Sequence, residues 1–523
     1  MSLSDLIQKI DSFVERTLHD YKPAKTDSKV IHDAIWGSNI YYPWEISLLD
    51  SPLLQRLRDI RQTGLAFHTY PTAGHSRFEH TLGVITLAER IARSINSKQQ
   101  TPLIKQSQIY ALRLAGLFHD IGHTFFSHLT EIYYSELPEF KSISKEINRQ
   151  YKRSPKGHEI LSFLITKSAH VRNLWEKIKK LYGTRFLKDI NLDEVAGYII
   201  SYAKDPSLQY MADIINGTYD VDKLDYLARD AKFCGVSIGY DFERYLTTIM
   251  VNVDKASGKQ KLFIPVSGIN ALEQIIINKL MLFGYIYHHQ KVRICELMFK
   301  YMLHRIFTYC TSIQTAEENW IDIRNITDFL NYTDSDFWSG KTLERLEPPD
   351  ARQILKNLIS RNIPKRALRI SRLYIKNFET DDESLLENYG KDPEKSLVSP
   401  GYRKFYSLCD SWSELLKLRE DILEAIPVQK RKKIHIDDIW IDIPKEPISK
   451  EAEETMIPLD KKGTKLMPLN SFFPIGEWVK GYRHSKWKAH IYTEDRFIGI
   501  VRDASRIVLK DKFNMELSEL ADM

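Results

Sequence analysis

The sequence predicts a mainly α fold, in which a helical core is followed by a smaller α+β lobe. Apolar residues recur at helical spacing in residues 3–21, 48–62 and 269–310. Residues 435–443 instead alternate between apolar and polar side chains, which is typical of a strand. We expect three parts: a helix and lead-in at 1–28, the core at 29–310 and the α+β lobe at 311–523.

The other elements follow from the same two periodicities and from turn residues. Turn-rich residues 69–77 precede a helix, and an acidic helix is expected near residues 220–230. Residues 376–402 and 445–467 are charged, contain proline and read as loops. Further helices are expected at 193–216 and within 319–372, and further strands at 29–33, 262–265, 490–492 and 497–501.

Composition places the chain among ordinary globular proteins. The formal charge of +6 suits an anionic small ligand as well as nucleic acid, so it does not separate the two. The four cysteines form no C-x-x-C pair, which favours a reducing cytoplasm over a disulfide framework. We find no signal-peptide pattern and no apolar run long enough for a membrane span, so we expect a cytoplasmic protein.

The stretch from Ala111 to Glu131 is the most informative in the chain. An apolar run ends at His119-Asp120, and His123 and His128 follow within a few residues. Burying such groups is costly unless something pairs or coordinates them. A neighbouring imidazole and carboxylate suit a divalent cation, with Fe, Mn, Zn, Ni and Mg all admitted by this donor set.

The remaining metal ligands are expected on other helices. His80 precedes His119-Asp120, and Asp222 follows it, each in an apolar helical context. A cation held by two imidazoles and two carboxylates keeps open positions and acidifies a bound water enough to make it a nucleophile. The sequence therefore predicts a hydrolytic metal centre, provided that these helices lie side by side.

At this point the chain resembles the HD-domain dNTP triphosphohydrolases, specifically the sterile-alpha-motif/HD antiviral enzymes. The resemblance is dense from about residue 29 to residue 291. We expect no sterile-alpha-motif domain, because the core begins too early in the chain. The matching segments are Gln55–Gln62 (QRLRDIRQ), Tyr70-Pro71, His75–Val84 (HSRFEHTLGV), Ala115–His123 (AGLFHDIGH), Phe126–His128 (FSH) and Asn216–Asp230 (NGTYDVDKLDYLARD).

The resemblance implies a role for each matching residue. The metal ligands would be His80, His119, Asp120 and Asp222. His128 would be the catalytic proton donor, with Glu131 and His158 orienting it, although the family commonly has Asp at the Glu131 position. Phosphate contacts would come from Arg77, His123, Lys223 and Lys279, and contacts around the deoxyribose from Gln62, Tyr226, Asp230 and Tyr287.

Two departures from the family pattern stand out. The family often has Gly-Pro where this chain has Thr124-Phe125, which would reshape the pocket floor and influence substrate choice. Lys279 takes the place of a phosphate-binding arginine if Tyr287 is the tyrosine that gates the sugar. A lysine keeps the charge but loses the bidentate fork.

The resemblance also implies a regulatory nucleotide site and a nucleotide-linked homo-oligomer, with a tetramer favoured. The activator would be a Mg-bound nucleotide, either GTP, dGTP or another dNTP. Residues 264–268 lack the basic residues expected there. The matching regulatory residues are Lys29, Asp50, Gln55, Arg58, Arg244, Lys291, Arg361 and Lys365.

The expected activity is metal-dependent hydrolysis of dNTPs to deoxynucleoside and inorganic triphosphate, serving dNTP pool control or antiviral defence. One alternative is an HD phosphodiesterase or nuclease acting on nucleic acid or a cyclic nucleotide. The other is a nucleotide-binding or single-stranded-DNA-binding protein with weak turnover, for which the basic run at 429–433 is the main feature. Gln62, Asp230 and the gating tyrosine favour the dNTP interpretation.

Overall fold

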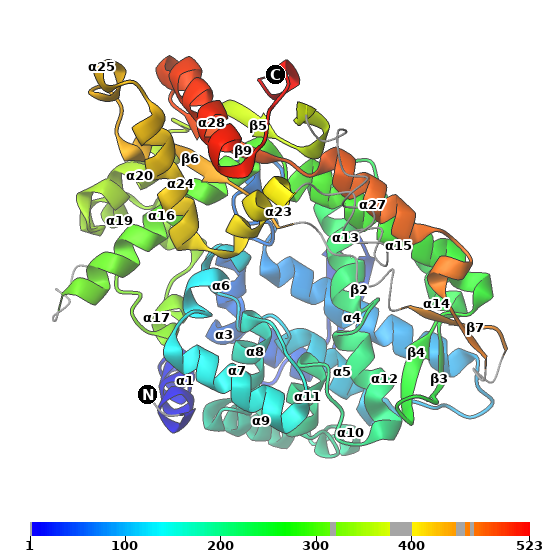
Figure 1. Cartoon of the computed structure of the whole chain (residues 1–523). Coiled ribbons are helices and arrows are strands. Elements are labelled where there is room, and N and C mark those ends of the chain that lie inside the picture. The colour runs from blue at the N-terminus through cyan, green and yellow to red at the C-terminus, as the bar shows by residue number, and fades with distance from the viewer. Residues whose placement is uncertain (1–2, 314–320, 377–399, 446–454, 461–464, 523) are drawn as a thin grey trace. The chain divides into compact units, whose positions relative to one another are not determined.

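The computed structural model describes residues 3–313, 321–376, 400–445, 455–460 and 465–522 (Figure 1). The fold is mainly α with small sheets, as predicted. It divides into two compact units. Unit 1 comprises Met1–Leu282, Phe299–Lys356 and Ser449–Ile475, and unit 2 comprises Phe283–Met298, Asn357–Ile448 and Gly476–Met523.

The domain boundaries expected at residues 28 and 310 stay a prediction. Much of the expected loops at 376–402 and 445–467 lies outside the described residues. Among the helices that the structure describes, none combines the length and apolar character needed to cross a membrane.

Unit 1 is built around a packed group of helices. Helices α4 (Arg77–Ser97) and α5 (Gln106–Phe118) lie against each other, and α13 (Val221–Phe233) packs on α4 (Figure 1). Each helix has apolar residues at helical spacing, and these form its buried face. Examples are Val84 on α4, Leu114 on α5 and Leu224 on α13. The core helices thus bring three chain segments together at their ends.

Local sequence signals fix those ends. Ser76 and Glu79 form a capping box, so α4 begins at Arg77 and His80 lies in its first turn. The α5 helix ends at Phe118, which leaves His119 at the C-cap. The Asp220 side chain accepts a hydrogen bond from the Lys223 amide at 2.7 Å and so starts α13 two residues before Asp222.

The single helix expected at 48–62 is wrong. The structure has α2 (Pro43–Leu49), α3 (Pro52–Gln55) and a 3-10 turn at Arg56–Asp59. Pro52 has no amide proton and disfavours the helical conformation of Ser51, which is extended (φ −72°, ψ 146°). The break therefore follows from one proline.

The other elements of unit 1 surround this core. The hairpin β1 (Lys29–Asp33) and β2 (Gly37–Tyr41) is antiparallel, as is β3 (Met250–Asp254) with β4 (Lys259–Phe263). The strand expected at 262–265 therefore begins and ends earlier. The remaining elements are α1 (Leu3–Leu18), α6 (His128–Tyr134), α7 (Pro138–Tyr151), α8 (Gly157–Lys167), α9 (Ala169–Tyr182), α10 (Arg185–Lys188), α11 (Leu192–Ile199), α12 (Gln209–Ile215), α14 (Phe242–Thr248), α15 (Ile269–Leu282), α17 (Ile326–Leu330), α18 (Asp334–Trp338), α19 (Gly340–Arg345), β7 (Met456–Pro458) and β8 (Leu466–Pro468).

Unit 2 is the α+β part. Its three-stranded antiparallel sheet has the order β5 (Lys365–Ile370), β9 (Ala489–Thr493), β6 (Trp440–Asp442). Helices α24 (Trp412–Ala425) and α28 (Ile498–Phe513) pack against each other, and α28 packs on β5. Unit 2 also contains α23 (Pro400–Ser407), α25 (Val428–Arg431) and most of α27 (Ile475–Lys486), while α16 (Gln290–Ser312) and α20 (Pro349–Ile359) have residues in both units.

Two strands expected in this part are corrected. Residues 497–501 begin helix α28, because the apolar positions continue at helical spacing through Val501, Val508 and Leu509. Of the strand expected at 435–443, only Trp440–Asp442 pairs in the sheet. His435 and Asp438 form a capping box, which holds Ile436–Asp438 in a 3-10 turn before this strand.

Candidate metal centre and active site

The structure brings the four predicted metal ligands together. The Nε2 atoms of His80 and His119 are 3.2 Å apart, and His80 Nε2 is 3.1 Å from Asp222 Oδ1. Asp120 completes the group, with carboxylate oxygens 3.7 Å from His80 Nε2 and 3.4 Å from His119 Nε2. These ligands come from α4, the end of α5 and α13. Asp222 is half-buried, and the other three are buried.

The hydrogen bonds behind the two imidazoles show that this group fits a cation. His119 Nδ1 is 2.7 Å from the Gly116 carbonyl oxygen, and His80 Nδ1 is 2.7 Å from Asp225 Oδ2. Both partners only accept, so both Nδ1 atoms carry a proton and the Nε2 atoms are the ones left to face a cation. The two carboxylates beside these Nε2 atoms favour positive charge between them, either a cation or, without one, a proton on His80 Nε2.

The electrostatics agree with a site built for positive charge. Burial lowers the pKa of His80, but hydrogen bonds to Asp222 and Asp225 outweigh it and raise the pKa to about 10. Burial raises the pKa of Asp120, yet His119 and Arg77 hold it well below its usual range. The carboxylates are therefore ionised and attract a cation at neutral pH.

A second layer of buried charge supports His80. Arg229 Nε donates to Asp225 Oδ2 at 2.8 Å, and Arg229 Nη2 donates to Asp33 Oδ2 at 2.8 Å. The backbone of Gly83 passes so close that a Cβ there would lie 1.9 Å from Asp225 Oδ1. Glycine at this position thus lets the carboxylate reach His80.

Sequence reasoning missed Asp225 and Arg229. Both belong to the quoted segment at 216–230, and their spacing of four residues along a helix is a pairing signal. Their connection to His80 is a contact between α13 and α4, which the spacing alone does not reveal.

Arg77 links the metal group to the predicted proton donor. Its Nη1 donates to Asp120 Oδ2 at 2.8 Å, and its Nη2 lies 3.5 Å from His128 Nε2. Its Nε donates to Ser127 Oγ at 3.0 Å. A guanidinium held in this way places positive charge between the two groups, where a phosphate would meet it.

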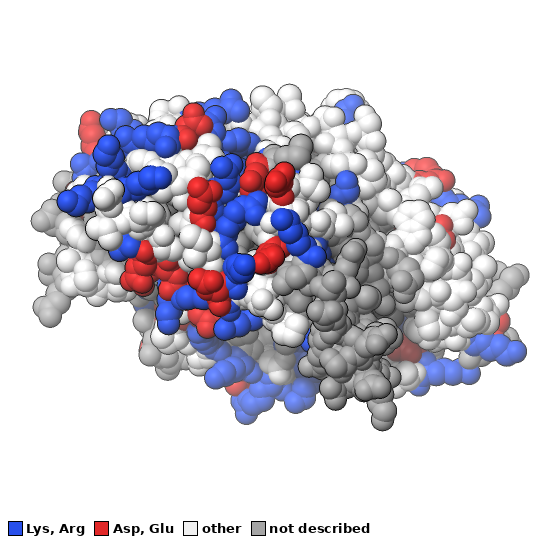
Figure 2. Space-filling model, turned by 45° about the horizontal axis from the view of Figure 1, so that its top comes forward, with Lys and Arg blue, Asp and Glu red and all other residues white. Residues whose placement is uncertain are grey.

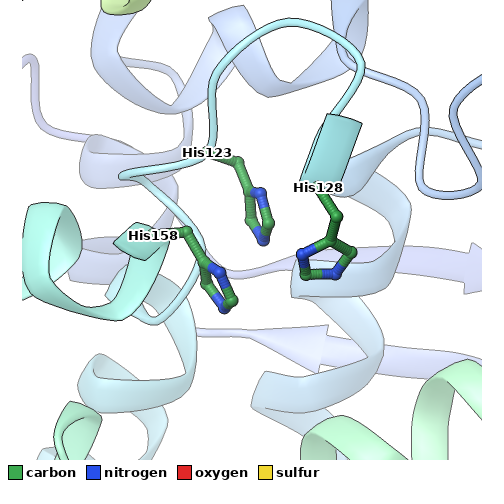
Figure 3. Close-up of side chains that lie close together, drawn as sticks. All are labelled: His123, His128 and His158. Atoms are coloured by element: carbon green, nitrogen blue, oxygen red, sulfur yellow. The ribbon is translucent and has the colours of Figure 1, made fainter. Parts of the chain in front are cut away.

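The predicted catalytic residues form a cluster of their own. His128 Nδ1 and His158 Nδ1 lie 3.0 Å and 3.2 Å from the same oxygen, Glu131 Oε2. The rings of His123 and His158 stack with centroids 4.1 Å apart, and His128 faces them (Figure 3). His123 Nε2 is 3.3 Å from Asp120 Oδ1, which joins this cluster to the metal group.

The pKa values of His158 and His123 shift in opposite directions within this cluster. Burial lowers the pKa of His158, but Glu131 outweighs it and raises the pKa above the ordinary histidine value. Burial and the Arg77 charge hold the pKa of His123 well below its usual range. Nitrogen atoms of the three histidines lie within 4.8 Å of one another, which is also metal-binding geometry, although Glu131 already engages two of the Nδ1 atoms.

The turn that leads to His128 is held by a residue far away in sequence. Phe126 and Ser127 have positive φ angles of 52° and 54°, which non-glycine residues rarely adopt. Asp334 Oδ1 accepts a hydrogen bond from the Phe126 amide at 2.6 Å, and Asp334 Oδ2 accepts one from the Arg61 amide at 3.0 Å. Asp334 is a third residue that sequence reasoning missed, since only the folded chain brings it here.

Thr124-Phe125, where the chain departs from the family pattern, is buried. The Phe125 ring stacks on Phe337 at 4.5 Å, and Thr124 Oγ1 lies 2.5 Å from Thr130 Oγ1. Both side chains are fully buried, so the departure fills the core behind the His128 turn. Its influence on substrate choice stays a prediction.

The other residues predicted to contact the substrate lie in several segments of the chain. Asp230 Oδ1 is 2.7 Å from His75 Nε2, and the backbone amide of Gln62 donates to the His75 backbone carbonyl at 3.0 Å. Gln62 and Asp230 are therefore both next to His75. Lys223 Nζ donates to the Gly217 carbonyl at 2.8 Å. Tyr226 is half-buried on α13; Lys279 belongs to unit 1, whereas Tyr287 belongs to unit 2.

The predicted regulatory residues also form small groups. Lys29 Nζ and Asp50 Oδ2 are 3.3 Å apart, and Arg58 Nε donates to Gln55 Oε1 at 2.8 Å. Arg244 donates to the Ser267 carbonyl at 2.7 Å. In unit 2, burial and then Lys365 and Arg361 lower the pKa of Lys291, so those three cations are neighbours.

Comparisons with known proteins agree with the geometry. A family model described as HD domain matches residues 77–230. The chain is 27% identical to an uncharacterized protein of Methanocaldococcus jannaschii over 94% of this chain and 84% of that protein. It is 29% identical to deoxynucleoside triphosphate triphosphohydrolase SAMHD1 of Bos taurus, over 64% of this chain and 58% of that protein.

The corresponding protein of Gallus gallus is 32% identical, over 42% of this chain and 36% of its own length. The chain therefore spans less than two thirds of the length of these two triphosphohydrolases.

Proposed function

From the HD domain at residues 77–230, we propose that this protein is a metal-dependent dNTP triphosphohydrolase. It would hydrolyse a dNTP to the deoxynucleoside and inorganic triphosphate. The proposal rests above all on one observation: the His80 and His119 Nε2 atoms lie 3.2 Å apart, beside two carboxylates and the His128 cluster. The similarity to SAMHD1 proteins supports the choice of substrate.

His80, His119, Asp120 and Asp222 would hold a divalent cation. The mixed imidazole and carboxylate donors suit Fe, Mn, Zn, Ni or Mg. When bound, such a cation supplies Lewis-acid activation and neutralises phosphate charge. The buried Asp225 and Arg229 keep the His80 ring oriented for this task.

His128 is placed to protonate the leaving group. Water attacks the α-phosphorus, the bond from that phosphorus to the 5′-oxygen breaks, and the 5′-oxygen needs a proton. Glu131 accepts the Nδ1 hydrogen of His128, and the Nε2 atom lies on the side of Arg77 and the metal group. We propose that Nε2 carries the proton to the 5′-oxygen when the substrate is bound. His158, which shares the Glu131 oxygen, helps to fix the carboxylate in place.

The surroundings support a nucleotide over a polymeric substrate. Among the residues that the structure describes, the buried Gln62 Oε1 lacks a hydrogen-bond partner, so it is available to a ligand donor. On the face drawn in Figure 2, Lys and Arg are interspersed with Asp and Glu. On the face drawn, this mixture is not the contiguous basic stripe typical of nucleic-acid binding proteins.

The decisive assay incubates the purified protein with Mn²⁺ or Mg²⁺ and each dNTP, singly and in pairs, and identifies the phosphate product. We expect inorganic triphosphate and deoxynucleoside in equal amounts. Pyrophosphate or orthophosphate as the first product would rule out attack at the α-phosphorus. Cleavage of a single-stranded oligonucleotide with no dNTP turnover would favour the phosphodiesterase alternative.

We further propose nucleotide regulation through an oligomer. The paired Lys29 and Asp50, with Gln55 and Arg58 close by in sequence, would read the base of an activator such as GTP or dGTP. Arg244, Lys291, Arg361 and Lys365 would contact the phosphates of a neighbouring nucleotide. The dNTP pairs in the assay test this, because an activator would raise turnover of a second nucleotide.

A further inference from the structure

A cavity of about 700 Å³ opens in unit 1 and contains none of the residues assigned above to metal, substrate or activator. It lies between the α7–α8 connection, the loop before α13, the β3–β4 hairpin and strands β7 and β8. Its volume falls within the range of small-molecule sites, roughly 300 to 1,000 Å³. The polar residues that carry the argument are Arg153, Asp213, Asn216, Lys259 and Lys261.

Three cations converge on this cavity. Lys259 and Lys261 alternate on β4 and so project from the same face of the strand, and Arg153 from the α7–α8 connection also lines the cavity. Burial lowers the pKa of Lys259, and the charges of Arg153 and Lys261 lower it further, which shows how close the three lie. Crowded like charges of this kind are stabilised by a bound anion.

The acidic residues of the cavity leave that positive charge incompletely offset. Asp254 is engaged by Lys261 at 2.8 Å and by Ser257 Oγ at 2.6 Å. Asp213 accepts a hydrogen bond from Gln209 at 3.1 Å, and burial raises its pKa. Within the described residues, Lys259 Nζ has a long contact, 3.5 Å, to Gln209 Oε1, and the Asp213 charge also acts on it.

We propose that this cavity binds a phosphate-bearing small molecule, with Arg153, Lys259 and Lys261 contacting the phosphate oxygens. An arginine fork and two lysines are the side chains that recognise such groups. Asn216 offers a polar side chain, and Phe263, Ile264 and Met456 give the cavity an apolar wall for the rest of the ligand. The proposal does not depend on the proposed hydrolysis.

The cavity adjoins the active-site helix through its own wall. Gly217 donates its amide to Asp220 Oδ2 at 3.0 Å and accepts a hydrogen bond from Lys223 Nζ at 2.8 Å. A ligand in the cavity would therefore touch the segment that positions Lys223 and Asp222.

The test is calorimetric titration of the full chain, with EDTA present so that no metal is bound and no hydrolysis occurs. The probes are inorganic triphosphate and a non-hydrolysable dNTP analogue. Lys259→Gln and Arg153→Gln each remove one cavity cation, and Lys255→Gln removes an exposed lysine in the turn of the same hairpin. Lys279→Gln, at another predicted phosphate contact that does not line the cavity, separately weakens any binding at the active site. Thermal melting checks that each variant is folded.

We expect triphosphate binding that survives Lys279→Gln, weakens about tenfold in Lys259→Gln and in Arg153→Gln, and is unchanged in Lys255→Gln. Tighter binding of the dNTP analogue would identify the ligand as a nucleotide, and equal binding would identify an inorganic polyphosphate. Identical isotherms for wild type, Lys259→Gln and Arg153→Gln would overturn the proposal. So would an equal loss in Lys255→Gln, which would indicate non-specific charge attraction.

Discussion

At the scale of single residues, the proposed metal centre would depend on groups that are not themselves ligands. Asp225 accepts the Nδ1 hydrogen of His80 and so decides which nitrogen of the ring is left to bind metal. Arg229 and Asp33 hold that carboxylate in turn. The four ligands could be predicted from the chain, because their residue types and order are distinctive. Their supporting layer could not, since it depends on contacts between helices.

Asp225→Asn tests this supporting layer. An amide placed at the same position can offer hydrogens to His80 Nδ1, which favours the wrong tautomer. We expect metal affinity to fall between roughly 10- and 100-fold, measured by calorimetric titration with Mn²⁺. The surface carboxylate variant Asp193→Asn is the matched control. An affinity unchanged in Asp225→Asn would show that the tautomer is set in another way.

Gly83→Ala tests the close approach of α4 to α13. The added methyl group would lie 1.9 Å from Asp225 Oδ1, so the carboxylate or the helix has to shift. We expect a loss of stability of at least about 1 kcal/mol, seen as a lower Tm in the metal-free protein. Gly74→Ala is the control, because a Cβ there meets nothing within 4 Å. Equal melting temperatures for the two variants would contradict the packing argument.

At the scale of elements, the turn before α6 is the strained part of the site. Asp334, at the start of α18, ties down the Phe126 amide and thus the turn that presents His128. Burial raises the pKa of Asp334 to about 7, although hydrogen bonds from the Phe126 and Arg61 amides oppose this. The turn therefore carries a group that titrates near neutrality.

This pKa gives the stability a pH dependence with a defined sign. The pKa of Asp334 is raised from its ordinary 3.8 to about 7 in the folded chain. The stability that protonated Asp334 contributes to the folded chain is therefore fully present below pH 3.8 and is lost as the pH rises through 7. In Asp334→Asn the group cannot ionise, and the change in Tm between about pH 5 and pH 8 should shrink. Ser335→Asn is the neighbouring control. A profile identical to wild type in Asp334→Asn would refute the assignment.

The elements themselves were predictable where one signal dominates. The helices expected after residues 69–77 and near residues 220–230 are α4 and α13, and His490-Ile-Tyr, expected as a strand, lies in β9. The sequence misled at Pro52, which splits a periodic segment, and at 497–501, where a short apolar run begins a helix. Short apolar runs fit both structures, and only packing against the rest of the unit decides between them.

At the scale of the whole molecule, the chain passes from one compact unit to the other more than once. Unit 2 takes residues from three separate stretches, so its sheet closes only when distant segments meet. This explains why the domain limits were hard to place from the sequence, in which composition changes gradually.

Nucleotide-linked assembly is the prediction at this scale. Light scattering should show a larger particle, with a tetramer favoured, when a Mg-bound guanine nucleotide is added. Asp50→Asn removes the carboxylate expected to read the guanine ring and should leave the protein in its smaller form, while Asp20→Asn, an exposed residue outside the predicted site, should assemble normally. Assembly that is independent of nucleotide would contradict the regulatory proposal.

The most direct test of the central claim compares wild type with Asp222→Ala after metal is stripped and Mn²⁺ is returned. The account predicts that triphosphate release from dNTPs reappears in the wild type alone. It also predicts that Asp222→Ala melts as a folded protein but binds Mn²⁺ far more weakly. Full activity in Asp222→Ala would show that His80, His119, Asp120 and Asp222 are not the metal ligands on which hydrolysis depends.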